Sequence, residues 1–325
     1  MATYDVICVG AGPTGLACAI EAVRAGMKPL VIDKGALCNS IFHYPVNMYF
    51  FTTPELLEIG DLPLVCAAEK PTRTEALKYY RKAAEHYGLE LRLYETVLRL
   101  EGNDGNFTIV TRTEKGTDQK YSSRKVVIAT GYYDLPNAIG VPGEDLPHVS
   151  HYYTEAHPFY DRDVVVIGGK NSAAEAALDL FRGGARVSLV HRGPAMGQTV
   201  KYWVRPDIDN RFKNGQVTPY FNAKVLEITK THVRISQDGA LRHIPAQQVF
   251  ALTGYHCSTK FFEQVGVRYD SDTLRAEYNP ETFETNVAGI YLAGSVVGGR
   301  INGEIFIENG RFHGEVLVKS IVGDR

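Results

Sequence analysis

The alternation of apolar and polar residues predicts a strand, a glycine turn, a helix and a second strand at the start of the chain. Residues 4–9 (YDVICV) form a β-branched apolar run, residues 10–15 contain three glycines, and residues 16–25 have helical composition. Residues 28–32 form a second apolar run, which ends at Asp33. The whole segment has about 30 residues, the size of a βαβ unit with parallel strands.

The same pattern returns in the middle of the chain. Residues 163–167 (DVVVI) predict a strand, residues 168–173 a turn, residues 172–182 a helix and residues 186–190 another strand. Two copies of one supersecondary unit indicate two nucleotide-binding domains rather than one.

The remaining elements are shorter. Thr72 and Glu75 have the spacing of a capping box and predict a helix that stops at Gly88. Four runs alternate like antiparallel strands, one run is typical of a buried strand, one strand leads into a late glycine turn, and one helix closes the chain: these are 89–93, 97–100, 107–112 and 120–122, then 126–129, 289–294 and 309–322.

Composition excludes several classes of protein. The chain has 325 residues, 44% of them hydrophobic and 22% charged, with a net charge of −2. This is the profile of a globular protein of about two domains, and it excludes disordered and fibrous chains. Near-neutral charge argues against non-specific nucleic-acid binding.

Location and cysteine usage lead to further expectations. No apolar run approaches the ~20 residues of a membrane helix, and the N-terminus lacks the basic region of a signal peptide, so we expect a cytoplasmic protein. The five cysteines are odd in number and form no C-x-x-C. We therefore expect no disulfide framework, no dithiol close in sequence and no metal site.

The first glycine turn has the spacing of a dinucleotide-binding motif. Gly10 would make the tight turn, Gly12 would let the backbone approach a pyrophosphate, and Gly15 would allow close helix packing. The pyrophosphate would lie at the helix N-terminus, where free N–H groups favour an anion. Asp33, at the end of the second strand, is placed to accept hydrogen bonds from a ribose.

The second turn departs from this motif in a way that changes the expected ligand. Lys170 replaces the middle glycine, although Ala173 keeps the final small residue. The following strand ends in His191 and Arg192 instead of an acid. Because these residues would bind a 2′-phosphate that a carboxylate would repel, the second site is predicted to prefer NADPH.

The chain resembles low-molecular-weight flavoprotein disulfide reductases of the thioredoxin-reductase type over essentially its whole length. The resemblance rests on the two turns, on Ala129-Thr130-Gly131 and on Leu292-Ala293-Gly294. Within that group it is most similar to the bacillithiol disulfide reductases, in residues 39–45, 57–61, 168–173 and 305–314.

The resemblance implies a fold and a set of binding residues. It implies an α/β homodimer in which each chain has two Rossmann-like three-layer domains, with residues 1–133 and 254–325 binding FAD and residues 134–253 binding NADPH. The implied FAD residues are Gly10, Gly12, Pro13, Thr14, Gly15, Asp33, Lys34, Ser40, Val97, Thr130, Gly131, Gly294, Ser295 and Ile305. The implied NADPH residues are Gly168, Gly169, Lys170, Asn171, Ser172, Ala173, His191 and Arg192.

Three departures from the family bear on the chemistry. Thioredoxin reductases carry a C-x-x-C before the second nucleotide strand, whereas residues 151–161 contain no cysteine, which excludes the usual internal dithiol. Thr14 stands where bacillithiol disulfide reductases typically carry a cysteine, and Ser295 replaces the acid that usually binds the flavin side chain. Cys38 precedes the segment that the resemblance brings near the flavin, so it is either a nucleophile or a packed loop residue.

These observations predict an NADPH-dependent FAD oxidoreductase that passes electrons to a small disulfide. The disulfide of bacillithiol is the expected substrate. One alternative is a ferredoxin or flavodoxin NADP reductase, which also lacks the C-x-x-C. Another is a non-catalytic flavoprotein that responds to NADPH.

Overall fold

The computed structural model describes residues 3–301 and 303–323, which form two compact units. The first unit holds the described residues up to His43, then Asn47–Leu135, and those from Tyr255 onward. The second unit holds Tyr44–Val46 and Pro136–Gly254. The chain therefore leaves the first unit and returns to it.

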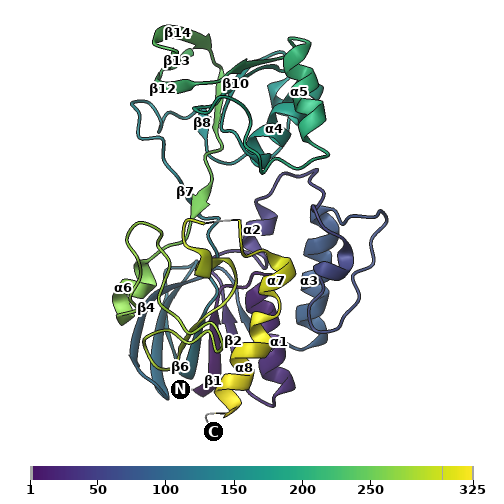
Figure 1. The fold of residues 1–325 in the computed structure, drawn as a ribbon. Coiled ribbons are helices and arrows are strands. Elements are labelled where there is room, and N and C mark those ends of the chain that lie inside the picture. Colours follow the sequence, from purple (N-terminus) through teal and green to yellow (C-terminus); the bar gives the residue numbers. More distant parts are fainter. Residues whose placement is uncertain (1–2, 302, 324–325) are drawn as a thin grey trace. The chain divides into compact units, whose positions relative to one another are not determined.

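The first unit is built on one mixed sheet with the strand order β3-β2-β1-β6-β5-β4, and β17 also pairs with β6 (Figure 1). The strands β1, β2, β3, β6 and β17 run parallel, and β4 and β5 join the sheet antiparallel. Their bounds are β1 Thr3–Val9, β2 Pro29–Ile32, β3 Leu91–Arg92, β4 Glu95–Asn103, β5 Asn106–Thr113, β6 Asp118–Ile128 and β17 Ile290–Leu292.

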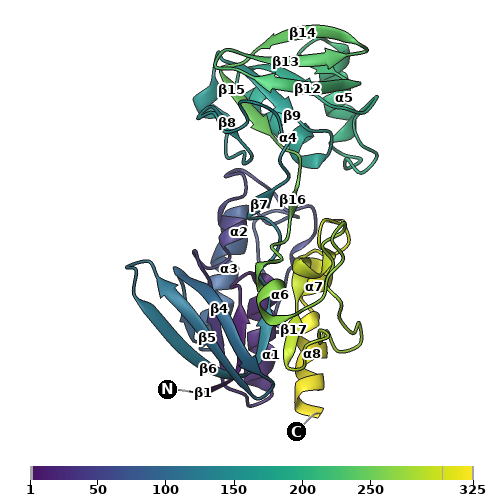
Figure 2. The ribbon, with the colours of Figure 1, turned by 90° about the vertical axis from the view of Figure 1, so that its left-hand side faces the viewer.

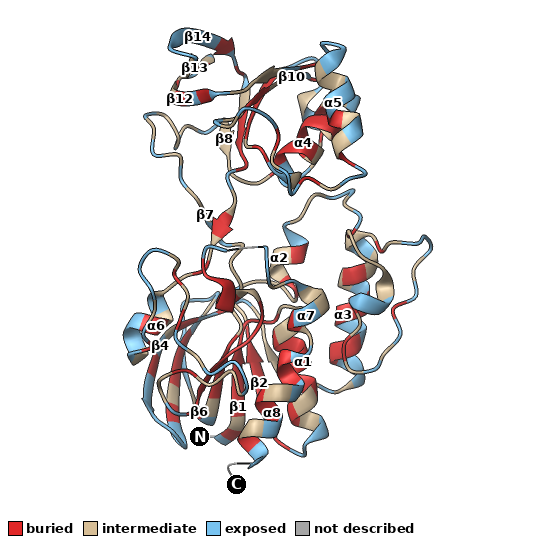
Figure 3. Cartoon of the chain, viewed as in Figure 1, coloured by how far each residue is buried: buried red, intermediate tan, exposed pale blue. Residues whose placement is uncertain are grey.

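Both faces of β1 are buried, as expected for a central parallel strand. Val6 and Cys8 pack against helices α1 and α8, while Ile7 and Val9 belong to the core on the opposite face. The burial colours of Figure 3 follow this pattern along the inner strands. The helices of this unit are α1 Pro13–Arg24, α2 Asn39–Phe42, α3 Arg73–His86, α6 Lys260–Val265, α7 Ile307–Gly310 and α8 His313–Gly323.

The second unit has three layers. Its central sheet is parallel, with the order β11-β10-β9-β15-β8. Val164 and Val166 of β9 face the core shared with α4, whereas Val165 and Ile167 face an antiparallel sheet of β12, β13 and β14, which Figure 2 shows. The bounds are β8 Val149–Ser150, β9 Asp163–Ile167, α4 Asn171–Arg182, β10 Arg186–Val190, α5 Arg205–Lys213, β11 Val217–Tyr220, β12 Ala223–Ile228, β13 His232–Gln237, β14 Ala240–Pro245 and β15 Gln248–Ala251. A separate two-stranded ribbon pairs β7 Leu135–Pro136 with β16 Tyr255–His256.

This architecture confirms the predicted α/β class and the repeated strand, turn, helix and strand. The capping box of α3 is also confirmed, because the Thr72 hydroxyl accepts from the Glu75 N–H and the Glu75 carboxylate accepts from the Thr72 N–H. Within the described residues, every helix is too short or too polar to cross a bilayer.

Three details of the prediction are wrong. Residues 91–92 pair parallel with β2, not antiparallel. The run 120–122 and the run 126–129, except its last residue, belong to one strand, β6, whose first half pairs with β5 while its last residues pair with β17. The closing helix is two helices, α7 and α8, and the side chain of Asn309 accepts the Phe306 N–H to begin the first of them.

Candidate functional site

The three glycines of the first turn have three different surroundings. A Cβ on Gly10 would lie 2.3 Å from the carbonyl oxygen of Ala129, and one on Gly15 would lie 2.0 Å from the carbonyl oxygen of Gly10. A Cβ on Gly12 would meet no atom within 4 Å. Gly10 and Gly15 are therefore required by packing, whereas the surface of Gly12 is open to an approaching phosphate.

Asp33 links the end of β2 to this turn. Its carboxylate accepts the Ala11 N–H at 2.7 Å and the Gly35 N–H at 2.8 Å. Burial raises the pKa of Asp33, and the two N–H donors act in the opposite direction. Each oxygen keeps a free lone pair, so the carboxylate can also accept from ribose hydroxyls.

Four chain segments converge on the carboxyl ends of β1, β6 and β17. A Cβ on Gly294 would lie 2.9 Å from Thr14 Oγ1, and one on Gly310 would lie 3.0 Å from the same oxygen and 3.5 Å from the Ile305 side chain. Ser295 Oγ lies 3.7 Å from the Cβ position of Gly131. Residues separated by up to 296 positions in the sequence, Thr14 to Gly310, thus form one cluster.

The residues present fit an FAD group. The Thr130 hydroxyl is buried and has no hydrogen-bond partner in the described chain, which is unusual for a native protein. Together with the open face of Gly12, it offers a donor where the dinucleotide would lie.

The remaining predicted FAD residues lie in α1, in α2, in β4 and directly after Asp33. Lys34 forms an ion pair of 2.8 Å with Asp134. Pro13 begins α1, and Ser40 lies in α2. Val97 is part of the hydrophobic core, and its strand starts beside Asp33, because the Glu95 N–H donates to the Asp33 carbonyl at 2.9 Å.

The second turn repeats the backbone of the first but not its side chains. Gly168 has φ +155°, and a Cβ on it would lie 2.6 Å from the Leu252 carbonyl oxygen and 2.9 Å from the Ala173 side chain. The imidazole of His191 covers Gly169, whose Cβ would lie 2.3–2.5 Å from three of the ring atoms. Burial and the neighbouring Arg192 lower the pKa of His191. Arg192 itself is exposed.

The loop of residues 197–201, which the sequence did not indicate as part of the site, is bonded to this turn. The Asn171 carboxamide accepts the Lys201 N–H at 2.9 Å and donates to the Thr199 carbonyl at 3.1 Å. The Gly197 N–H donates to the Gly169 carbonyl at 2.7 Å. The Asn171 side chain therefore ties the start of α4 to residues 199–201, while Lys170 and Ser172 remain exposed at the start of this helix.

Cys38 lies in the first unit, directly before α2. It is 1% exposed, has φ +53° and donates its N–H to the Ala11 carbonyl at 2.9 Å. Burial, together with the charge of Asp33, raises the pKa of the Cys38 thiol well above its ordinary value. These surroundings favour the packing interpretation over that of a ready thiolate.

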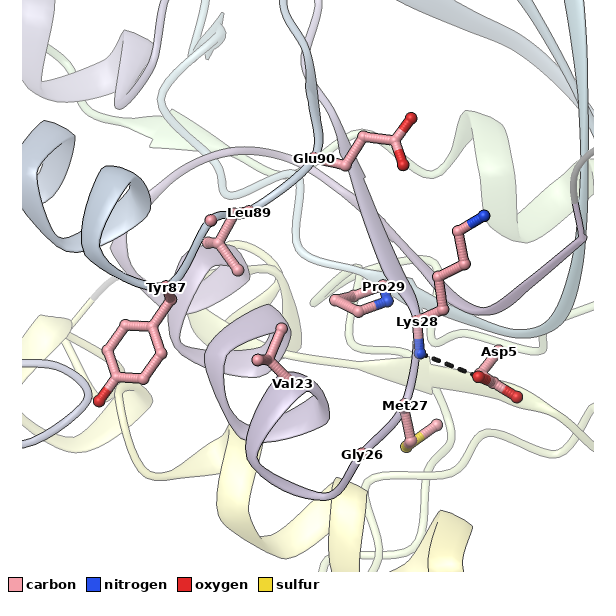
Figure 4. A pocket seen from close by; sticks show the side chains of 10 residues that line it. Asp5, Val23, Gly26, Met27, Lys28, Pro29, Tyr87, Leu89 and Glu90 are labelled. Atoms are coloured by element: carbon pink, nitrogen blue, oxygen red, sulfur yellow. Dashed lines mark hydrogen bonds between the residues drawn. The ribbon is translucent and has the colours of Figure 1, made fainter.

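One further pocket lies near the amino-terminal ends of β1 and β2 in the first sheet. Figure 4 shows its lining, where the Lys28 N–H donates to the Asp5 carboxylate at 2.9 Å. Because β1 and β2 begin there, the pocket is separate from the glycine turn at the carboxyl end of β1.

Comparison with known proteins gives consistent matches. The model of the family described as pyridine nucleotide-disulphide oxidoreductase matches residues 7–294. The chain is 45% identical to the bacilliredoxin reductase Bdr of Bacillus subtilis strain 168, over 99% of this chain and 98% of that protein. It superimposes on the bacillithiol disulfide reductase Bdr (YpdA) of Bacillus cereus with a TM-score of 0.97 at 41% identity, and on that of Staphylococcus aureus with 0.95 at 39%, each match covering 100% of both chains.

Proposed function

This chain belongs to the pyridine nucleotide-disulphide oxidoreductase family, and from that membership we propose that it uses FAD and NADPH to reduce the disulfide of bacillithiol. The observation that carries the proposal is full-length similarity to two solved structures named bacillithiol disulfide reductase, at 41% and 39% identity. The relative at 45% identity is named a bacilliredoxin reductase, which makes bacilliredoxin the competing acceptor. Reduction of one disulfide to two thiols would consume one NADPH and one proton.

The first unit supplies a binding frame for FAD. When bound, the flavin would accept a hydride from the nicotinamide and pass two electrons onward. Gly12 would leave room for the pyrophosphate, Asp33 would accept from ribose hydroxyls, and the buried Thr130 hydroxyl would gain a partner. Ser295 would hydrogen-bond the flavin side chain more weakly than an acid would.

The second unit supplies a binding frame for NADPH. The first turn of α4 presents its free N–H groups to a pyrophosphate, as helix N-termini do. Arg192 can pair with a 2′-phosphate, and His191 lies beside it. The positive charge of Arg192 at the end of β10 supports a preference for NADPH over NADH.

The electrons would leave without a protein dithiol. The sequence has no C-x-x-C, Thr14 stands in place of the family cysteine, and Cys38 is buried. A direct route from the flavin to the substrate disulfide is consistent with all three facts.

The same three facts favour one second candidate function. A ferredoxin or flavodoxin NADP reductase needs no thiol at all, because it delivers single electrons to a protein. A flavoprotein that signals through NADPH without turnover is a third possibility, which steady NADPH consumption would exclude.

The test is a double-mixing experiment. The purified protein is reduced with NADPH under anaerobic conditions and then mixed separately with bacillithiol disulfide, oxidised bacilliredoxin, ferredoxin and flavodoxin. Reoxidation of the flavin by bacillithiol disulfide, faster than by the other three, supports the proposal. Reoxidation by ferredoxin or flavodoxin alone would instead support a ferredoxin or flavodoxin NADP reductase. Faster reoxidation by bacilliredoxin would show that the substrate is a protein disulfide.

A further inference from the structure

His313, the first residue of α8, holds a backbone group of the late glycine turn. Its side chain is buried, with the residue 7% exposed, and its Nδ1 lies 3.1 Å from the Gly294 N–H. Because an N–H donates, Nδ1 is the acceptor and the ring is neutral with its proton on Nε2. Burial lowers the pKa of His313 to about 4, which keeps the ring an acceptor near neutral pH.

Aromatic stacking sets the orientation of that imidazole. The ring stacks on Phe283 with centroids 4.1 Å apart and planes 23° apart, and Phe283 stacks on Tyr278 at 5.7 Å and 8°. Phe283 has φ +60°, a conformation that is costly for a bulky residue. Its backbone is held there by bonds from Phe283 N–H to Asn279 and from Leu292 N–H to Phe283.

Gly294 is constrained from the other side as well. It has φ +76°, and the Thr14 side chain occupies the space where its Cβ would be. The next residue, Ser295, lies beside Gly131 of the neighbouring turn. The Ala293–Gly294 peptide directly precedes Ser295, so its orientation restrains where the Ser295 backbone, and with it the side chain, is placed.

We propose that His313 is a positioning residue for the flavin: it fixes the Gly294 peptide so that the Gly294–Ser295 turn faces the FAD group. The inference rests on the proposed use of FAD. It does not depend on NADPH as the reductant or on bacillithiol disulfide as the acceptor. His313 itself does not need to touch the cofactor. The Gly294 N–H is already bonded to His313, so Ser295 rather than that N–H would face the ligand.

The test compares three substitutions in apoprotein that is titrated with FAD. His313→Phe keeps an aromatic ring but leaves the Gly294 N–H without an acceptor, which should weaken FAD affinity roughly 5- to 30-fold and shift the visible flavin spectrum. His313→Asn restores an acceptor close to the position of Nδ1 and should recover most of that affinity, although it loses the stack. Lys319→Gln, an exposed position on the same helix α8, is the control and should bind FAD as the wild type does.

Thermal stability of the three apoproteins separates positioning from folding. Equal losses of FAD affinity in the Phe and Asn variants, in proportion to lost stability, would overturn the proposal, as would an unchanged affinity and spectrum in His313→Phe. If neither His313 variant folds, Phe283→Leu, which keeps the acceptor but removes the stack, must lower FAD affinity by roughly 2- to 5-fold for the proposal to stand. A wild type that binds FAD but reduces no disulfide would refute the proposed function and leave this inference intact.

Discussion

Asp33 and His191 occupy equivalent places in the two units. Asp33 directly follows β2, and His191 directly follows β10, the second strand of the repeated strand–turn–helix–strand segment in each case. In both segments the first glycine of the turn donates its N–H to the carbonyl of the last residue of that strand: Gly10 to Ile32 at 2.7 Å, and Gly168 to Val190 at 3.0 Å. Each side chain also contacts the second residue of its turn. Under the proposed function, a carboxylate in one unit and an imidazole beside Arg192 in the other would suit the two frames to different dinucleotides.

Replacing Arg192 with Ser should lower the use of NADPH selectively. If the guanidinium pairs with the 2′-phosphate, its loss should cost about 1.5–3 kcal/mol, or roughly 10- to 150-fold in kcat/KM. The rate of flavin reduction should be measured against NADPH and NADH concentration. Equal losses with the two nucleotides would indicate a structural role for Arg192 instead.

Gly169→Ala should act on the same site through His191. The new Cβ would lie 2.3 Å from the imidazole, so the ring must move, whereas the backbone of Gly169 lies outside the left-handed region and accepts alanine. We expect a roughly 10-fold weaker NADPH affinity, equivalent to about 1.4 kcal/mol, with little change in melting temperature. His191→Asn is the matched variant, because it removes the imidazole that the new Cβ would displace. Adding Gly169→Ala to it should not weaken NADPH affinity further. An additional loss in the double variant would contradict the assignment.

Gly12→Val should give a folded protein without flavin. The residue has φ −74° and ψ 173°, which suits valine, and its Cβ would meet nothing within 4 Å. The branched side chain would instead block the pyrophosphate, so the purified variant should be colourless and retain the circular dichroism spectrum of the apoprotein. Gly15→Val is the contrasting variant, because its Cβ would overlap the Gly10 carbonyl, and it should fail to fold. A fully flavinated Gly12→Val protein would show that this turn does not bind FAD.

Thr14→Ala and Cys38→Ser should both retain reduction of FAD by NADPH, since that half-reaction needs no protein thiol. Because Cys38 is buried and its pKa is raised, we also expect Cys38→Ser to turn over a disulfide substrate nearly as fast as the wild type. Mass spectrometry of the wild type after substrate addition provides the independent measurement. A mixed disulfide at Cys38, together with loss of turnover in Cys38→Ser, would make it the nucleophile.

Glu175→Gln should stabilise the second unit at alkaline pH. Burial raises the pKa of Glu175 to about 7, so the folded state binds the proton more tightly than the unfolded state does. Stability is then lost as the pH rises from about 4.5 to about 7, and the loss stays complete above that range. The variant should be more stable by roughly 1–3 kcal/mol at pH 8 and equal to the wild type at pH 4, as measured by urea unfolding. A constant difference across this range would show that the charge of Glu175 is not responsible.

Local sequence was sufficient for the repeated unit because its determinants are local. A β-branched run, a glycine turn and a helical segment specify strand, turn and helix within about 30 residues, and parallel pairing then brings Asp33 and His191 to the carboxyl ends of their strands. The capping box of α3 was predictable for the same reason, since Thr72 and Glu75 are three residues apart.

The tertiary structure decided what depends on distant pairing. Whether residues 91–92 run parallel or antiparallel, and whether 120–128 is one strand or two, is determined by which strands lie beside them and not by alternation alone. The same holds for the contacts that specialise the site. His191 lies over Gly169, Thr14 fills the space beside Gly294, and His313 accepts the Gly294 N–H across 19 positions of sequence. Side chains that meet only when strands and helices pack leave no periodic signal in the chain, so these relationships could be read only from the folded molecule.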